Sequence, residues 1–256
     1  MRRWPPRIRS GGPDLFRRRP VRLLALLQAR DEMAYLPGYV ANVAAQVDGI
    51  VALDDGSTDS SADFLASRPE VIELLRVPPE RPRWDEPGNH RKLVAAALRH
   101  GAEWIVSVDA DERLERQFRL RAERVIRRGR LLGLSGYSVR IRSLWGSYDA
   151  VRMDGDWAHR FVPRLFRART NHRFDDRPLH ASKAPLQALA GGRWPSAELV
   201  IYHLRMIEPA AREARRARYE RLDPDNRWQP GPGYAYLTDE AGLRLTPIDP
   251  ERGYVE

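Results

Sequence analysis

The sequence contains no cysteine among its 256 residues. This absence excludes a disulfide scaffold, zinc–thiolate sites and a cysteine nucleophile, and it fits a reducing, cytoplasmic environment. The longest apolar run, Leu23 to Leu27, is far shorter than the roughly 20 residues that span a bilayer. Because Gln28, Arg30 and Asp31 follow at once, we interpret this run as a buried strand, and we expect neither a signal peptide nor a transmembrane helix.

Lysine is also scarce, because Lys92 and Lys183 are the only two and 42 arginines supply the remaining basic charge. The formal net charge is +9. Residues 1–20 hold seven arginines and one aspartate, and residues 113–130 hold eight arginines and two glutamates, so each stretch contributes +6 and the rest of the chain carries −3. The charge therefore belongs to an arm and one helix. It suits steering of an anionic ligand or peripheral contact with the inner face of a membrane, and we expect no nucleic-acid partner.

From residue 21 onward, apolar runs alternate with helical patterns. Strands are expected at residues 22–28, 50–53, 71–75, 104–108, 137–141, 161–166 and 199–203. Helices are expected after the first strand, with Pro37 in the first turn, at 62–67, 91–100 and 115–130, and from beyond 203 to about Leu222. The proline-rich residues 77–89 are expected to form a loop. This alternation predicts an α/β fold with a mostly parallel sheet covered by helices on both faces.

Three regions are expected along the chain. Residues 1–20 have few core-forming side chains and are predicted to be a disordered basic arm. Residues 21–222 form the predicted domain, with a ligand-binding half at about 21–118 and a second half at about 119–222. Residues 223–256, rich in Pro, Gly and Tyr, are predicted to be an extended C-terminal tail.

Two acidic motifs follow buried strands of the predicted sheet. They are Asp54-Asp55 and Asp109-Ala110-Asp111. Ligands of open parallel sheets bind beyond the carboxyl ends of the strands, so both motifs are expected at one sheet edge. Carboxylates there accept hydrogen bonds from a nucleobase or ribose, or hold a hard divalent cation. Taken singly, each motif is equally typical of a surface turn or a helix cap.

The order of these motifs resembles the family 2 glycosyltransferases, which are inverting enzymes of the GT-A fold. The resemblance covers about residues 21–118. It rests on the first strand running into Ala29-Arg30-Asp31-Glu32, on Leu53-Asp54-Asp55-Gly56-Ser57-Thr58-Asp59, and on the segment Gly101 to Glu112 with its Asp-x-Asp motif. A weaker likeness continues through Arg164-Leu165-Phe166-Arg167, Leu179-His180 and Tyr202-His203-Leu204.

The resemblance implies a nucleotide-diphosphate sugar donor, with UDP or GDP as the nucleotide, and Mn²⁺ or Mg²⁺ as cofactor. It implies that Ala29 and Glu32 border the nucleotide and that Asp54 or Asp55 contacts the base. Asp109 would reach the ribose or a metal-bound water, and Asp111 would ligate the metal directly. Lys92 is a further candidate for donor contact, with a solvated helix face as the alternative.

The acceptor side is less defined. His203, at the end of a late strand, is a candidate metal ligand or phosphate contact, or else a structural histidine. An inverting transfer needs a general base. Asp176 is the first choice, with Asp175, Asp154 and Asp156 behind it, although all four also suit a simple loop. Trp157 and His180 are expected to bind the acceptor, with core packing as the alternative for the tryptophan. The acceptor itself, whether a glycan, a lipid-linked sugar or a small molecule, is left open, as is the role of the protein in polysaccharide biosynthesis.

Rival functions fit the sequence less well. A nucleotidyltransferase of similar architecture usually carries a Gly-rich basic loop after the first strand, where this chain has Ala29-Arg30-Asp31-Glu32. A haloacid-dehalogenase phosphatase would need a threonine soon after Asp111, where Glu112-Arg113-Leu114 stands. A basic nucleic-acid-binding protein is supported only by the net charge. The resemblance to the family 2 glycosyltransferases therefore implies hexosyl or related glycosyl transfer.

Overall fold

The computed structural model describes residues 20–78, 80, 85–177, 182–186 and 194–256. The predicted arm, apart from residue 20, and His180 lie outside the described residues. Within the described chain, no helix combines the length and apolarity needed to cross a membrane.

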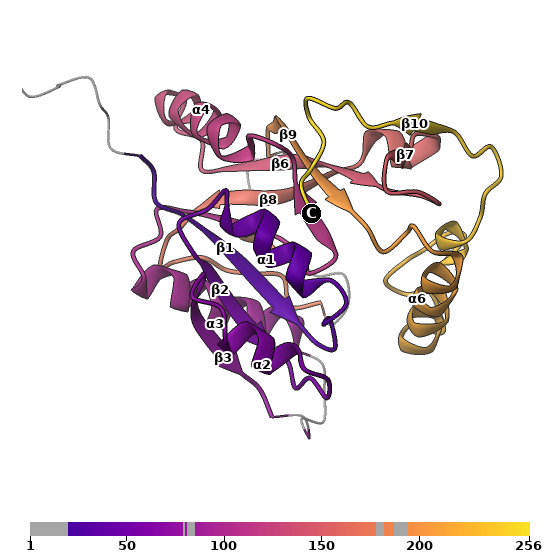
Figure 1. Ribbon diagram of the computed structural model, residues 1–256, viewed down its shortest axis with the longest axis horizontal. Helices are drawn as coiled ribbons and strands as arrows, with labels where there is room; N and C mark the ends of the chain where they lie inside the picture. The colour runs from indigo at the N-terminus through magenta and orange to yellow at the C-terminus, as the bar shows by residue number, and fades with distance from the viewer. Residues whose placement is uncertain (1–19, 79, 81–84, 178–181, 187–193) are drawn as a thin grey trace, which may run out of the picture.

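The first half of the chain alternates strands and helices as predicted (Figure 1). Its elements are β1 (Leu23–Ala29), α1 (Leu36–Ala44), β2 (Ile50–Asp54), α2 (Ser61–Ala66), β3 (Val71–Arg76), α3 (Glu86–Arg99) and β4 (Trp104–Ser107). Pro37 stands in the first turn of α1, where its missing N–H costs nothing. The loop predicted over 77–89 is wrong at its end, because α3 begins at Glu86, capped by Asp85, whose carboxylate accepts from Gly88 N at 2.8 Å.

The second half adds shorter and less regular elements. They are β5 (Glu112–Leu114), α4 (Phe118–Leu131), β6 (Gly136–Ser143), β7 (Ala150–Arg152), the 3₁₀ turn η1 (Gly155–His159), β8 (Phe161–Arg167), β9 (Ser196–His203), α6 (Pro209–Leu222), the 3₁₀ turn η2 (Ala235–Leu237) and β10 (Leu245–Pro247). Strand β5 was not predicted, since its three residues include two charged side chains.

Eight strands form one mixed sheet in the order β3-β2-β1-β4-β8-β6-β9-β5. The first four are mutually parallel, which confirms the predicted α/β architecture for the ligand-binding half. From β4 outward the sheet is mixed: β8 runs antiparallel to both β4 and β6, and β9 runs parallel to β6. Strand β5 follows β4 in sequence, yet it closes the far edge of the sheet against β9.

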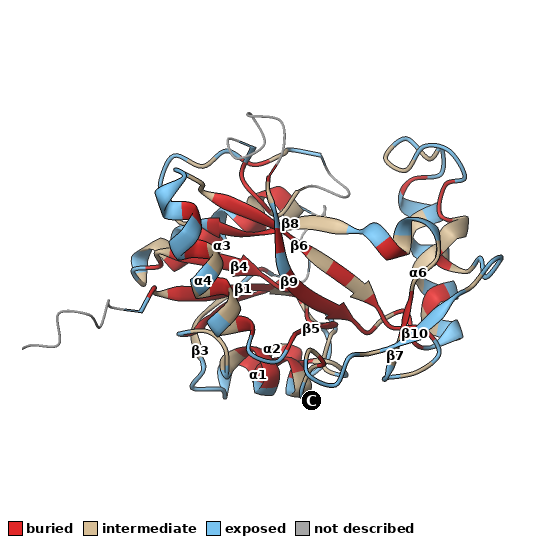
Figure 2. Cartoon of the chain, turned by 90° about the horizontal axis from the view of Figure 1, so that it is seen from above, coloured by how far each residue is buried: buried red, intermediate tan, exposed pale blue. Residues whose placement is uncertain are grey.

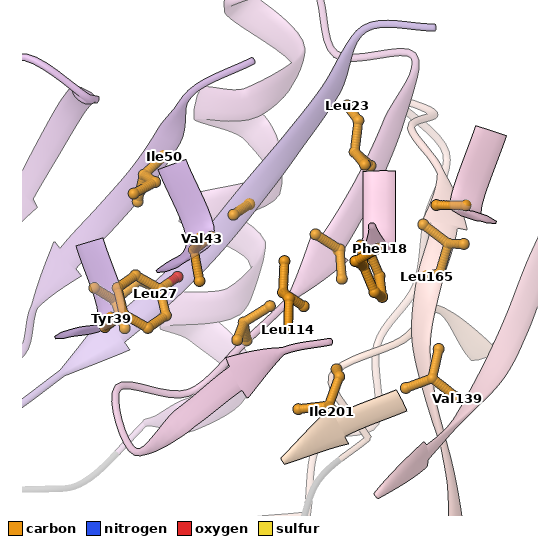
Figure 3. Close-up of a cluster of buried hydrophobic side chains, with 14 of the residues drawn as sticks. Leu23, Leu27, Tyr39, Val43, Ile50, Leu114, Phe118, Val139, Leu165 and Ile201 are labelled. Carbon is orange, nitrogen blue, oxygen red and sulfur yellow. The ribbon is translucent and has the colours of Figure 1, made fainter. Parts of the chain in front are cut away.

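Buried side chains are concentrated in the strands and on the helix faces turned toward them (Figure 2). One core cluster joins α1 and α4 to one face of the sheet, with residues such as Leu27, Val43, Phe118 and Ile201 (Figure 3). On the other face, α3 packs through Leu93 and its alanines. The amphipathic patterns of the helices thus cover both faces, as the alternation predicts.

The C-terminal segment packs on the domain instead of extending away from it. Tyr234 and Leu237 are buried with Trp145 and Met206 in a small separate cluster. Strand β10 pairs with β7, and the last residues return over β9 and α1 (Figure 1), where Asn42 donates to Val255 O at 3.0 Å. Residues 223–256, predicted as a tail, therefore form part of the folded body.

Candidate functional site

The two acidic loops meet at one edge of the sheet. Strands β1, β2 and β4 are parallel, with Ala29 level with Asp54 and Leu26 level with Ser107. Their carboxyl ends therefore point the same way, and the loops that follow them lie side by side. This is the edge at which open parallel sheets bind ligands.

Asp54 and Asp55 are both almost fully buried at the end of β2. Asp55 accepts hydrogen bonds from Asn89 of α3 at 2.9 Å and from Gln28 of β1 at 3.4 Å, while its own N–H donates to Ala29 O at 2.8 Å. Asp54 Oδ2 accepts from Ser57 N at 3.2 Å, and its Oδ1 is buried without a hydrogen-bond partner among the described residues. These carboxylates are thus fixed in position, and Asp54 retains an unused acceptor.

The loop Asp109–Glu112 crosses from β4 to β5. Its geometry is fixed by Leu204 N, which donates to Asp111 O at 2.8 Å, and by Glu112, whose carboxylate accepts from Asp109 N at 2.8 Å. Glu112 and His203 are directly opposed across β5 and β9. The short polar strand β5 therefore brings the Asp-x-Asp motif against the end of β9.

Basic side chains surround the carboxylate of Asp111. Its Oδ2 is paired with Arg205 Nε, and it lies 3.4 Å from His203 Nε2 and 3.7 Å from Arg215 Nη1. Burial by itself would raise the pKa of Asp111, but His203, Arg205 and Arg215 hold it well below its usual value. Asp111 is therefore an anion clamped by cations from the β9–α6 connection and from α6.

Asp109 is held in a similar way from the opposite side. Lys183 pairs with its Oδ1, and Arg164 of β8 lies 3.2 Å from its Oδ2 and 2.9 Å from Glu112 Oε1. Against the effect of burial, the charges of Lys183 and Arg164 lower the pKa of Asp109. Burial raises the pKa of Glu112, partly offset by Arg164. Arg164 itself is only 7% exposed.

Glu32 joins the nucleotide side to the Asp-x-Asp motif. Arg205 donates to both oxygens of Glu32 through Nη2 and to Asp111 through Nε, so one guanidinium bridges the β1 end and the 109–112 loop. Burial raises the pKa of Glu32, with Arg205 opposing the shift and Asp111 adding to it. The predicted nucleotide residue Glu32 and the predicted metal residue Asp111 therefore belong to a single charged cluster.

The arrangement does not fit a divalent cation. Among the described residues, no three His, Asp or Glu side chains converge as a metal-ligand set. Both oxygens of Asp109 are engaged by cations, and Asp111 Oδ2 is shared by three basic side chains. His203 Nε2 also lies 3.2 Å from Arg215 Nη1. Metal ligation by Asp109, Asp111 and His203 remains a prediction, and it would require these cations to move.

Among the described residues, the candidates Lys92, Asp175 and Asp176 make their contacts outside this cluster. Lys92 lines a surface cavity of about 310 Å³ with Leu53 and Arg99. Asp176 pairs with Arg91 at 2.7 Å and Asp175 with Arg177 at 2.5 Å, so both base candidates are in exposed ion pairs. Their assignment as general base remains a prediction.

Trp157 lies in an aromatic group. Its ring meets Trp145 edge-on at 5.5 Å and Tyr236 at 5.9 Å, and the Arg152 guanidinium lies 5.1 Å from its centre. This is the packing alternative considered for the tryptophan, and its contact with an acceptor remains a prediction.

Sequence reasoning did not select four basic members of the site: Arg164, Lys183, Arg205 and Arg215. The one available signal was position, since Arg164 begins the Arg-Leu-Phe segment and Arg205 follows His203 by two residues. Composition gave no help, because three of the four are arginines in a chain that has 42 of them.

Comparison with known proteins adds two sequence relatives. Uncharacterised proteins from Mycobacterium tuberculosis and Mycobacterium bovis are each 28% identical over 239 residues, covering 87% of this chain and 57% of theirs. The chain thus spans a little over half the length of these relatives. No family model matches the sequence.

Solved structures resemble this chain in fold, although they share little sequence identity with it. A crystal structure of TarS from S. aureus superposes with a TM-score of 0.51 at 12% identity, covering 78% of this chain and 66% of that one. TarS in complex with UDP-GlcNAc gives 0.48 at 14% identity over 86% and 71%, and a mannosyltransferase from Pyrobaculum calidifontis with GDP-Man and Mn²⁺ gives 0.48 at 16% over 80% and 62%. The superposition on TarS thus shows a shared GT-A-like α/β fold.

Proposed function

We propose that the protein transfers a sugar from a nucleotide-diphosphate donor to an acceptor hydroxyl, with UDP or GDP as the nucleotide. One observation carries the proposal: Asp54, Asp55, Glu32 and the 109–112 loop lie at the carboxyl edge of a GT-A-like sheet, and Arg205 joins Glu32 to that loop. TarS, whose fold this chain shares, also forms a complex with UDP-GlcNAc, which agrees with a sugar nucleotide as the class of ligand.

Each part of a donor has a matching group at this edge. Asp55, fixed by Asn89 and Gln28, is placed to accept the imide N–H of a uracil or guanine, and Asp54 Oδ1 is a second buried acceptor. The basic side chains around Asp109 and Asp111 suit the two phosphates. Inversion, the general base and the acceptor belong to the proposal as the sequence predicts them.

The direct test is nucleotide binding by isothermal titration calorimetry with the whole chain. UDP and GDP are titrated with and without Mn²⁺, and one of them is expected to bind at micromolar concentrations. Asp55→Asn should weaken that nucleotide at least tenfold, about 1.4 kcal/mol, because it removes the anionic acceptor while preserving shape. Asp63→Asn on α2, whose carboxylate is 90% exposed, is the matched control.

Transfer is then measured with labelled UDP- and GDP-sugars by following release of the nucleoside diphosphate. A wild-type protein that binds no nucleoside diphosphate under either condition would overturn the proposal. A nucleotidyltransferase would instead consume a nucleoside triphosphate and release pyrophosphate, so the same assay with UTP and GTP separates the two enzymes. Binding only to nucleic acid, weakening steeply with salt, would favour the third class.

A further inference from the structure

Four carboxylates, buried or partly buried, share the site with four basic side chains. Glu32, Asp109, Asp111 and Glu112 are each paired with at least one of Arg164, Lys183, Arg205 and Arg215. The four acidic charges are therefore already balanced by four protein cations, and a divalent metal ion would find none of these carboxylates unpaired.

Several nitrogen atoms of Arg164, Arg215 and the adjacent His203 are buried and have no hydrogen-bond partner among the described residues. They are Nε and Nη1 of Arg164, Nε of Arg215 and Nδ1 of His203. A buried donor without an acceptor costs about 1–3 kcal/mol, and native proteins tolerate few of them. Three such donors on Arg164 and Arg215, which touch Asp109 and Asp111, together with the unpartnered His203 Nδ1, indicate a ligand rich in acceptor oxygens.

A diphosphate would supply both the negative charge that pairs with these cations and the oxygen atoms that accept from the buried donors. It brings two to three negative charges and several oxygen acceptors, and guanidinium groups bind phosphate with well-directed, charge-assisted hydrogen bonds. Arg205 and Arg215 come from the segment that begins at the end of β9 and continues into α6 (Figure 1), and Arg164 comes from β8. The cations therefore approach the 109–112 loop from separate elements, as a clamp on a central anion would.

We propose that Arg164, Arg205 and Arg215 bind the diphosphate of the donor and neutralise the leaving group, so that the protein requires no divalent metal. This inference rests on the proposed function. In the transfer, the acceptor oxygen forms a bond to the anomeric carbon while the bond from that carbon to the diphosphate oxygen breaks. The electron pair leaves with the nucleoside diphosphate, and the hydroxyl proton passes to the general base, predicted as Asp176 or Asp175. The guanidinium groups stabilise the charge that grows on the departing oxygen.

Asp111 then has a different role from the one that the resemblance implies. Its carboxylate pairs with Nε of Arg205, which precedes α6, and lies 3.7 Å from Nη1 of Arg215 within α6. Glu32 pairs with Nη2 of the same Arg205. Asp111 is a positioning residue that fixes the arginines before the donor binds, which avoids reorganisation during the reaction.

The test measures UDP, GDP and the matching monophosphates by calorimetry with wild-type protein, once in EDTA and once in Mn²⁺. We expect the diphosphate dissociation constants to agree within about threefold between the two conditions, and the monophosphates to bind at least about thirtyfold more weakly. Transfer rates should likewise be unchanged by EDTA. Arg215→Gln should weaken diphosphate binding at least about tenfold in EDTA, whereas Arg216→Gln, at the half-buried neighbouring position on α6 that pairs with Glu220, should not.

The outcomes separate this inference from the proposed function. Diphosphate binding or transfer that appears only with Mn²⁺ would overturn the arginine clamp and leave the glycosyltransferase proposal standing. Absence of nucleotide binding in both conditions would overturn both. Equal loss in Arg215→Gln and Arg216→Gln would also overturn the clamp, since it would indicate only a change in general charge. The metal comparison uses wild-type protein, so it is decisive even where a variant fails to fold.

Discussion

Arg113 ties the Asp-x-Asp loop to the rest of the fold and offers a stringent test of the structure. Its side chain, in the short strand β5, is only 2% exposed. Its guanidinium donates to Ala110 O and Glu112 O, both at 3.0 Å, and to Tyr35 O at 3.1 Å. It thus joins the loop 109–112 to the residue preceding α1.

Replacing Arg113 by Met keeps most of the stem volume and removes every donor. Three largely buried carbonyls then lose a charge-assisted bond, at about 1–3 kcal/mol each. The guanidinium is costly to bury, as the lowered pKa of Arg113 indicates. Removing it therefore recovers part of this loss. We expect a net loss of about 3 kcal/mol in the free energy of unfolding. At about 2–4 °C per kcal/mol for a chain of this size, the melting temperature falls by roughly 6–12 °C.

The measurement is urea-induced unfolding followed by far-UV circular dichroism, with Arg124→Met on the exposed face of α4 as control. Arg113→Lys should be milder than Arg113→Met, because one ammonium can reach some of the same carbonyls. A loss below about 1 kcal/mol for Arg113→Met would refute the reasoning, since it would mean that desolvation of the guanidinium cancels its hydrogen bonds.

Two further predictions concern the core. Burial lowers the pKa of His90 to about 3, so the folded protein keeps it neutral while the unfolded chain takes up a proton below about pH 6.5. Its stabilising contribution is therefore complete above about pH 6.5 and falls toward pH 3, with a loss of about 2 kcal/mol at pH 5. Replacing it in His90→Leu should flatten the profile of the urea midpoint between pH 7 and 5. An unchanged profile would contradict the low pKa of His90. In α4, Gly129→Ala places a Cβ against Tyr137 Oη, in a position that the tyrosine must vacate. It should therefore cost about 1–3 kcal/mol by overpacking, seen as a lower melting temperature, and an unaltered melting temperature would show that the tyrosine moves freely.

Much of the fold follows from the sequence because the first half has strong, regular patterning. Strands β1 and β2 are continuous apolar runs, fully or nearly fully buried, and they end at polar residues that mark their boundaries. Two elements depart from the patterns. Helix α3 starts at Glu86 within a proline-rich stretch, because Pro87 is tolerated in a first turn. Strand β5 has no apolar run, since Glu112 and Arg113 are buried by pairing and not by hydrophobicity.

The candidate site likewise has a part that could be predicted from the sequence and a part that could not. The acidic residues were predictable because Asp54 and Asp109 follow recognisable strands, and parallel strands end at one edge. Their partners were not, because Arg164, Lys183 and Arg205 reach Asp109 or Asp111 from 55, 74 and 94 residues away in the chain. Arg164 lies on β8 in the mixed half of the sheet, where no periodic signal fixes the strand order, and Lys183 and Arg205 lie outside the strands.

The energetics of this cluster argue for a role in binding. Buried ion pairs contribute little to stability, because desolvation of both charges offsets their attraction. Apolar side chains of similar volume would hold the sheet edge at least as well as Asp111 with Arg205, or Asp109 with Lys183. The same cluster leaves buried arginine N–H groups without acceptors among the described residues, which costs further free energy. A site that carries these costs in the absence of a ligand recovers them when an oxygen-rich anion binds. Its charge and its hydrogen-bonding capacity therefore agree with the diphosphate proposed as its ligand.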